Sequence, residues 1–364
     1  MGFTLPEYHT PSFEDSFLKD APNIKTAPVE TDGVAPSGYH AMSIFPEYFK
    51  IDGSWVLPEE SRMDCVAVTR DAGGGAWVDI VEFRRLKRGD NVVLGRTEDG
   101  SDGIYVNANP FEDEGSEGDA FAFRVGRSRE TAYSRDYDEL YELLRFEKEY
   151  GYIVWVLGPA VAFDHDSRVA LSSLIEKGYV DALLAGNALA THDLEAALLG
   201  TALGQDIYTQ ENQPNGHYNH LDLLNLARGQ GSIEKLIENE DIQDGIIYSA
   251  IKKEIPFVLA GSIRDDGPLP PVYANAYEAQ DAMRNIARKA TTVVALATQL
   301  HTIAVGNMTP SYIVSNEKVR PVYFYSVDIS EFAVNKLRDR GSLSATPIVA
   351  NVQDFLVHLS NNLL

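Results

Sequence analysis

Six short runs of apolar residues in the second half of the chain constrain its fold more strongly than any other feature. They are rich in β-branched and aromatic residues and lack polar alternation, which is typical of strands buried on both faces of a sheet. Helical patterns separate them, so we expect a mainly parallel sheet with right-handed crossovers. The runs predict strands over 152–157, 181–185, 256–260, 291–297, 321–327 and 346–350. The sequence therefore predicts a doubly wound α/β fold.

Three segments between these strands carry apolar residues at helical spacing. They are SRVALSSLIEKG (167–178), NAYEAQDAMRNIARKA (275–290) and SEFAVNKLRDRG (330–341). The last is framed by Ser330 in the N-cap position and by Gly341 just beyond its expected end, and both residue types are common at such boundaries. We expect these helices to cover the sheet.

The first part of the chain has a different pattern. Residues 1–40 mix Pro, Gly, Asp and Glu without a period, which indicates an extended arm or an edge that wraps around another part. Within 41–130, the alternating runs SWVL, CVAVTR, WVDIVEF and NVVLGR predict a small β-rich domain. The polar helical segment YSRDYDELYELLRFEKEY is expected to connect it to an α/β domain over 150–364. The acidic stretch FEDEGSEGD is interpreted as a solvated loop, with a metal site as the alternative.

Charge and cysteine content exclude several classes of function. The 364 residues include 54 acidic and 31 basic side chains, and the formal charge of −23 opposes binding to nucleic acids and anionic membranes. The N-terminus lacks a signal-peptide pattern, and no run approaches the ~20 apolar residues of a membrane span. The single cysteine, Cys65, excludes an intrachain disulfide, and it is expected to be a buried thiol rather than a nucleophile. We expect a cytoplasmic protein.

A glycine follows each of the first three predicted strands of the α/β domain. Ligands bind beyond the carboxyl ends of parallel strands, and glycine lets the backbone approach a phosphate and present its N–H groups. The three loops begin with Gly158, Pro159 and Ala160, with Gly186, Asn187 and Ala188, and with Gly261, Ser262 and Ile263. None contains a GxGxxG or Walker motif, and each alone also fits an ordinary strand-to-helix turn. Together they indicate a nucleotide site.

Asp328 ends the fifth predicted strand. A carboxylate at this place accepts hydrogen bonds from both ribose hydroxyls of NAD and repels the 2′-phosphate of NADP. No arginine follows Asp328 directly, which favours NAD. A helix-capping role is the alternative.

Three charged residues, Arg264, Asp265 and Asp266, follow the third glycine loop and precede the stiff segment PLP. This frame favours an active-site role, in which Arg264 binds a substrate carboxylate and an aspartate binds an amine or transfers a proton. An internally neutralised turn is the alternative. His217 and His220 lie three residues apart in GHYNHL, where a contact to substrate or cofactor, a structural role and a metal site all remain open.

Several separate blocks over residues 150–359 carry a specific family pattern. They are GYVDALLAGNALATHDLEAALLGTALG, GHYNHL, PFVLAGSIRDDGPLP, YEAQDAMR, LATQLHTIAVGNM and VDISEFAVNKLRDRGS. In these blocks the chain resembles the archaeal-type ornithine cyclodeaminase family, also called the LOR/SDH-like family. That family is related to the C-terminal region of cyanobacterial arginine dihydrolase and ornithine cyclodeaminase fusion proteins. Upstream, IDGSWVLPEESRMDCVAV and LKRGDNVVLG resemble the family's middle β-rich domain.

The resemblance implies a Rossmann-like NAD domain related in fold to deoxyhypusine synthase. It also implies a small amino-acid substrate, no metal, and conversion of L-ornithine to L-proline and ammonia with NAD recycled within one turnover. The substrate would lie near Arg264, Asp265, Asp266, His217 and His220. Beyond the glycine loops and Asp328, the matching blocks place four more residues at the cofactor, namely His192, Asp193, Asn307 and Ile329.

Two domains of related proteins have no counterpart in the resemblance. They are the family's usual N-terminal domain and the guanidine-modifying domain of the fusion proteins, so arginine dihydrolase activity is not implied. Two other functions stay open: an amino-acid or opine-type NAD-dependent dehydrogenase, and a non-catalytic NAD-binding regulator. The extended arm and the frequency of symmetric assemblies among enzymes predict a homo-oligomer, either a dimer or a tetramer.

Overall fold

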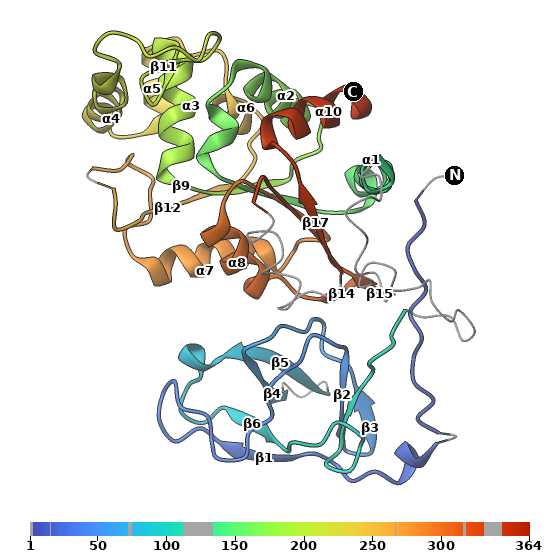
Figure 1. Ribbon diagram of the computed structural model, residues 1–364. Helices are drawn as coiled ribbons and strands as arrows, with labels where there is room; N and C mark the ends of the chain where they lie inside the picture. Colours follow the sequence, from blue (N-terminus) through green and yellow to red (C-terminus); the bar gives the residue numbers. More distant parts are fainter. Residues whose placement is uncertain are drawn as a thin grey trace.

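The computed structural model describes residues 3–14, 16–71, 75–111, 134–265, 267–315, 318–330 and 344–364. A β-rich part formed by the first third of the chain lies beside a larger α/β part (Figure 1). The predicted fold class is confirmed. Most of the helix predicted over 330–341 and of the acidic stretch 111–119 falls outside the described residues.

The β-rich part consists of two antiparallel sheets. One has the order β1-β6-β4-β5 and the other has the order β3-β2-β7. Their strands are β1 (Lys25–Pro28), β2 (Glu47–Ile51), β3 (Ser54–Val56), β4 (Cys65–Asp71), β5 (Ala76–Glu82), β6 (Asn91–Leu94) and β7 (Ile104–Val106). Strand β1 lies within the segment expected to be an arm, where it pairs with β6. Residues 25–28 therefore form an edge of this sheet.

The first residues of the chain run along both parts (Figure 1). The ring of Phe3 packs against Phe146 and Tyr323 of the α/β part, with centroids 5.3 and 5.7 Å away. The ring of Phe13 stacks on Trp55 of the β-rich part at 5.0 Å. The first residues of the arm are thus anchored by aromatic contacts to both parts.

The α/β part is built on a six-stranded parallel sheet. Its order is β12-β9-β8-β13-β16-β17. The strands are β8 (Ile153–Leu157), β9 (Ala182–Gly186), β12 (Phe257–Ala260), β13 (Thr292–Leu296), β16 (Tyr323–Asp328) and β17 (Ser344–Val349). Numbered along the chain, this order is 3-2-1-4-5-6, which is the Rossmann arrangement. All six predicted strands are present within two residues of their expected ends.

Helices cover both faces of this sheet, as the uninterrupted apolar runs require (Figure 1). In β8, Ile153, Trp155 and Leu157 face one apolar core, while Val154 and Val156 face the other. The first core includes α2 (His165–Glu176), α3 (Asn187–Leu199), α4 (Asn219–Gln230), α5 (Ile233–Asn239), α6 (Ile246–Lys252), α10 (Val352–Leu363) and the connector α1 (Ser134–Tyr150). The second includes α7 (Ala276–Ala287) and α8 (Gln299–Met308).

A hairpin of the α/β part binds the segment that leads into β4. It is formed by β14 (Tyr312–Ser315) and β15 (Lys318–Pro321). The backbone N–H of Val314 donates to the carbonyl of Glu59 at 2.9 Å, and the N–H of Ser311 donates to the carbonyl of Ser61 at 3.0 Å. These bonds fix one side of the junction between the two parts.

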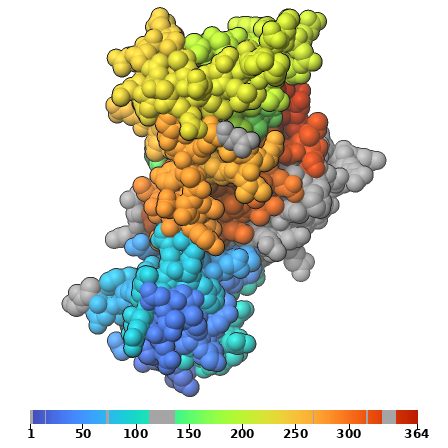
Figure 2. All heavy atoms as spheres, turned by 90° about the vertical axis from the view of Figure 1, so that its left-hand side faces the viewer, coloured from blue at the N-terminus to red at the C-terminus, as the bar shows by residue number. Residues whose placement is uncertain are grey.

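Buried ion pairs hold the other side of the junction. Arg62, from the β-rich part, pairs with Glu60 and Glu82, and Glu82 also pairs with Arg284 of α7. Arg62 is 2% exposed and Arg284 is 3% exposed. Around them, Arg84 and Arg85 pair with Asp281 and Arg288 pairs with Glu60. Figure 2 shows the orange surface of α7 resting on the cyan surface of the β-rich part.

Opposing effects set the pKa of Glu82. Burial raises this pKa, but the adjacent guanidinium groups of Arg62 and Arg284 outweigh burial and hold it below its usual range. Glu82 is therefore the charged group shared by two buried arginines from different parts of the chain.

We predict that Glu82→Gln lowers the free energy of unfolding by about 3 kcal/mol, because it leaves buried arginines without their shared charge. Denaturant unfolding followed by tryptophan fluorescence measures the loss. Asp32→Asn, which removes a carboxylate from an exposed pair with Lys87, is the matched control and should leave the unfolding midpoint in place. Equal midpoints for the two variants would show that the buried network adds no stability.

Candidate functional site

The strand order predicts a ligand crevice between β8 and β13, because connections leave these two neighbours toward opposite faces of the sheet. Gly158 follows β8 there. A Cβ atom at Gly158 would lie 1.9 Å from the carbonyl oxygen of Ala297, the residue after β13. Ala297 itself has a φ of +49°. The two backbones touch at the carboxyl edge, meaning the edge where the parallel strands end, and only glycine fits this approach.

The rest of the first loop forms a short 3-10 helix, η3 (Pro159–Ala162). Gly158 occupies its N-cap and Pro159 its first position, where a missing N–H costs nothing. The carbonyl of Ala160 accepts a hydrogen bond from the side chain of Gln353 in α10, at 3.2 Å. The loop is thereby tied to the start of the helix that follows the edge strand β17.

The second loop leads directly into α3. Gly186 is the N-cap residue, and its lack of a side chain leaves the first N–H groups of a thirteen-residue helix without a side-chain cap. Asn187 is buried, and its Oδ1 accepts from the backbone N–H of Leu269 at 3.0 Å. Its Nδ2 donates to Asp265 at 3.4 Å. Ala188 follows in the first helical turn.

The third loop turns sharply after β12. The N–H of Gly261 donates to the carbonyl of Tyr273, and a Cβ on Gly261 would lie 2.9 Å from the same oxygen. The carboxylate of Asp265 accepts from the N–H of Ser262 at 2.7 Å, while the side chain of Arg264 is exposed. Asp266 lies outside the described residues. Asp265 is thus bound within its own turn as well as to Asn187.

Exposed apolar side chains stand at the carboxyl edge. Ile263 follows β12 and is fully exposed, Leu300 follows β13 and is 73% exposed, and Ile329 follows β16 and is 75% exposed. Beside Ile329, Asp328 ends β16 and accepts from the N–H of Ser330 at 2.8 Å. Exposed apolar residues grouped beside open backbone and one carboxylate are typical of a ligand site.

Asp193 has a structural role that the sequence did not reveal. Its carboxylate is fully buried, pairs with Arg168 at 2.9 Å, and accepts from the N–H groups of Ile246 and Ile247 at 3.0 and 2.8 Å. The backbone contacts fix the start of α6, and the ion pair joins α3 to α2. The predicted contact to the cofactor therefore does not fit this placement.

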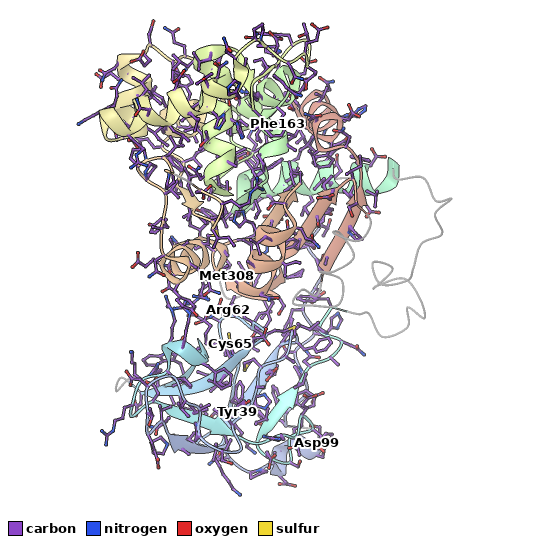
Figure 3. The ribbon with its side chains drawn as sticks, turned by 60° about the vertical axis from the view of Figure 1, so that its left-hand side comes forward. Tyr39, Arg62, Cys65, Asp99, Phe163 and Met308 are labelled. Carbon is purple, nitrogen blue, oxygen red and sulfur yellow. The ribbon has the colours of Figure 1, made fainter. Side chains whose placement is uncertain are left out.

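His192 is also held inside the protein. Its Nδ1 lies 2.9 Å from the buried carboxylate of Glu195, and its ring packs edge-on against Phe163, labelled in Figure 3. The ring of His220 lies 6.3 Å away, and its Nδ1 is buried without a partner among the described residues. This cluster lies along α3, beyond the turn that begins the helix.

His217 precedes α4, and His220 lies in its first turn. The ring of His220 lies 6.3 Å from that of His192, which is in the second turn of α3. Farther along α4, Arg228 reaches the loop after β12. The contact of the histidine pair with a substrate held by that loop stays a prediction.

Asn307 lies in the last turn of α8. The helix begins at the carboxyl edge, and eight residues place Asn307 about 12 Å from its start. Met308, the next residue, lies on the side of the sheet that faces Arg62 and the β-rich part (Figure 3). The contact of Asn307 with the cofactor stays a prediction.

Three features of the site escaped the sequence analysis. One is the turn of Ala297 and Thr298 after β13, which carries no glycine. The second is His301 in the first turn of α8, whose Cε1 lies 3.0 Å from the place of a Cβ on Gly186. The third is Arg228 of α4, whose Nη1 lies 2.7 Å from the place of a Cβ on Gly267. The apolar run that ends before Ala297 could have indicated the turn after β13 and His301, because ligand-binding loops follow the carboxyl ends of strands.

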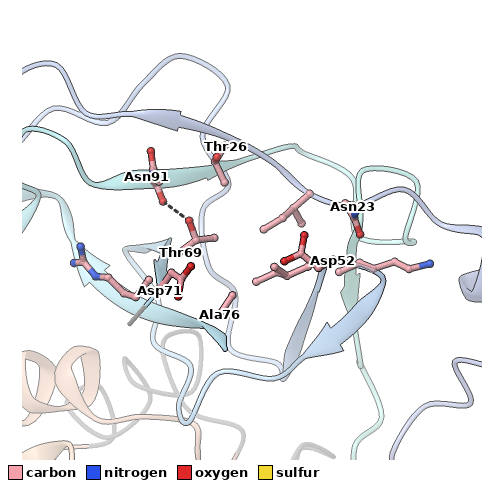
Figure 4. Close-up of a pocket in the computed structure, with 11 residues that line it drawn as sticks. Asn23, Thr26, Asp52, Thr69, Asp71, Ala76 and Asn91 are labelled. Atoms are coloured by element: carbon pink, nitrogen blue, oxygen red, sulfur yellow. Dashed lines mark hydrogen bonds between the residues drawn. The ribbon is translucent and has the colours of Figure 1, made fainter. Parts of the chain in front are cut away.

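The β-rich part contains a separate cavity of about 260 Å³ (Figure 4). Thr69 on its wall donates to the carbonyl of Asn91 at 3.3 Å. Lys50, also on the wall, donates to the carbonyls of Lys19 and Ala21 at 2.7 and 2.8 Å. These groups are occupied within the protein, so the cavity offers less binding chemistry than the carboxyl edge.

Cys65 is buried, as expected, and burial raises the pKa of its thiol to about 12. Within the described ranges, no group of three or more His, Cys, Asp or Glu side chains is arranged to hold a metal ion. Nor does any helix in those ranges combine the length and apolar character needed to cross a membrane.

Comparison with known proteins identifies the family. The model of the family described as "Arginine dihydrolase ArgZ-like, C-terminal, Rossmann fold" matches residues 140–359. The ornithine cyclodeaminase of Methanocaldococcus jannaschii is 36% identical over 95% of this chain and 79% of its own length. The chain belongs to the archaeal ornithine cyclodeaminase (LOR/SDH) family, which is related to the C-terminal part of the cyanobacterial proteins ArgZ and AgrE.

Two solved structures from the ornithine cyclodeaminase and ArgZ/AgrE group are similar to this chain. The LOR/SDH protein of Methanococcus maripaludis has a TM-score of 0.82 at 35% identity, and the match covers 94% of this chain and 98% of the other. The ternary complex of AgrE with ornithine and NAD+ has a TM-score of 0.58 at 33% identity, covering 94% of this chain and 46% of AgrE.

We predict that Gly158→Ala weakens NAD+ binding at least about tenfold, because the added Cβ pushes apart the backbones at the crevice. Titration calorimetry with NAD+ measures the change. Gly229→Ala, on α4 with nothing within 4 Å of the added Cβ, is the control and should bind as the wild type does. Normal binding by Gly158→Ala would place the cofactor elsewhere.

Proposed function

We propose that this chain is an NAD-dependent ornithine cyclodeaminase, which converts L-ornithine to L-proline and ammonia. The observation that carries the proposal is the crevice between β8 and β13, where the order 3-2-1-4-5-6 brings glycine loops to one edge. The relatives named ornithine cyclodeaminase and the AgrE complex with ornithine and NAD+ support the choice of reaction.

The residues of the carboxyl edge fit a dinucleotide. Gly158 and Gly186 let Ala297 and His301 pack against the loop backbones, where added Cβ atoms would meet them, and so bring the ends of neighbouring strands close together. The uncapped N–H groups at the start of α3 suit the pyrophosphate, since a helix N-terminus favours an anion. Asp328 would accept the ribose hydroxyls and repel a 2′-phosphate, which selects NAD over NADP. The exposed Ile263 and Ile329 would cover the flat rings.

The charged loop after β12 would hold the amino acid. Arg264 is exposed there, and Arg228 reaches Gly267 of the same loop from α4. Either guanidinium would bind the substrate carboxylate, while Asp265 would attract an ammonium group. The hydrogen bonds from Asn187 to Asp265 and from Leu269 to Asn187 connect this loop to the start of α3. Cofactor and substrate loops would therefore be held in one frame.

When bound, NAD would accept a hydride from an amine-bearing carbon and return it to the cyclic imine, so no net NADH forms. The protein's own task is to position the substrate carbon at the crevice, exclude water and move protons between the two amines. Positioning the substrate, excluding water and moving protons would all fall to the loops after the parallel strands.

We predict that wild-type protein with catalytic NAD+ forms proline and ammonia from L-ornithine in equal amounts, with many turnovers and no lasting rise in absorbance at 340 nm. Amino-acid analysis and an ammonia assay measure the products. A lasting rise at 340 nm would instead identify an amino-acid dehydrogenase. Tight NAD+ binding with no reaction of ornithine or other amino acids would identify a regulator.

We also predict that Asp328→Ala weakens NAD+ binding about tenfold, the loss expected for a charged hydrogen-bond acceptor. Binding of NADP+ should weaken less or improve, because the repulsion of its 2′-phosphate disappears. Fluorescence titration with both cofactors gives the ratio. Asp354→Ala, which removes an exposed carboxylate in the first turn of α10, is the control. An unchanged ratio would show that Asp328 does not face the ribose.

A further inference from the structure

His301 occupies a particular place in the crevice. It lies in the first turn of α8, which starts after β13, yet its ring reaches the end of β9. Since β8 lies between these strands in the sheet, the imidazole extends across the carboxyl end of β8. The carbonyl of Ala260, which ends β12, lies 3.7 Å from the same point of Gly186. His301 therefore lies among the ends of four neighbouring strands.

The ring of His301 approaches Gly186 through its Cε1 edge. Cε1 and Nδ1 of His301 lie 3.0 and 3.9 Å from the place of a Cβ on Gly186. Glycine at 186 is what lets the ring lie this close to the backbone. The ring is partly buried, so one side packs on the protein while part of it stays accessible.

The imidazole also has a suitable protonation state. Burial lowers the pKa of His301 below its ordinary value, and no charged side chain of the described residues counteracts this shift. The carboxylate of Asp265, in the loop after β12, is engaged by Ser262 and Asn187. A histidine with a lowered pKa is neutral at pH 7 and able to accept a proton.

We propose that His301 is the group that carries protons between the two amines of the substrate, which deepens the proposed function and rests on it. A ring nitrogen of His301 takes a proton from the ammonium on the carbon to be oxidised, so that this amine nitrogen has the electron pair needed for the oxidation. The other ammonium releases a proton to solvent before it attacks, which is the one proton by which ornithine exceeds proline plus ammonia. The imidazolium then returns its proton to the amine that leaves. The C–N bond breaks, its electron pair stays on nitrogen, ammonia departs, and the only redox partner is the cofactor already proposed.

The proposal predicts distinct effects of His301→Gln, which keeps the size and polarity of the side chain without its titration. With NAD+ binding and thermal stability unchanged, kcat should fall about 100-fold or more, as for loss of a general base. Wild-type kcat should rise with pH through a pKa below 6.5, and this limb should vanish in the variant. His358→Gln, on an exposed face of α10, is the control with normal kcat.

A second readout needs no turnover. In protein labelled at histidine 13Cε1, the signal missing from His301→Gln belongs to His301. We expect this signal to shift when L-ornithine is added to the wild type in the presence of NAD+. Under the same conditions it should not shift in Gly186→Ala, whose Cβ displaces the ring. An unmoved signal in the wild type, or full kcat in His301→Gln, would overturn the inference. A shifted signal without proline formation would instead refute the proposed reaction and keep His301 at the ligand.

Discussion

The backbone contact between Gly158 and Ala297 is the constraint on which the site depends. It occurs where the sheet reverses its winding, so the loops after β8 and β13 leave toward opposite faces and open a crevice. Any side chain at Gly158 would meet a carbonyl oxygen at 1.9 Å and separate the two central strands. The positions of Gly186, His301 and the loop after β12 are all defined relative to this contact.

The junction of the two parts shows how a chain with a charge of −23 uses its few basic residues. Arg62 and Arg284 are buried between carboxylates, and Arg84 and Arg85 gather at Asp281. Arginine suits this place because its guanidinium stays charged and satisfies several acceptors at once. The hairpin at β14 adds backbone bonds to the same junction. The α/β part is thus held in a fixed relation to the β-rich part, on the side of α8 remote from the crevice.

Local patterns predicted the elements well and the tertiary contacts poorly. The parallel strands were found because burial on both faces leaves an uninterrupted apolar run, as in Ile153–Leu157. The roles of Asp193 and His220 were not predicted. The partners of Asp193 are 25 or more residues away along the chain, and His220 contacts α3 only after the chain turns back. Glycine was a useful signal at 158, 186 and 261. It could not reveal the loop after β13, where Ala297 adopts a left-handed conformation without it.

The proposed cofactor site depends on uncharged backbone groups more than on charged side chains. Long-range repulsion by a strongly acidic protein opposes an anionic dinucleotide, so attraction has to come from groups that act at contact distance. The open N–H groups at the start of α3 and the glycine backbones supply it without net charge. Charged side chains stand at the rim instead, as Arg264 and Asp328 do, where they select among ligands. A neutral imidazole between these groups adds no charge to the cofactor site, yet it accepts one proton when an ammonium group arrives.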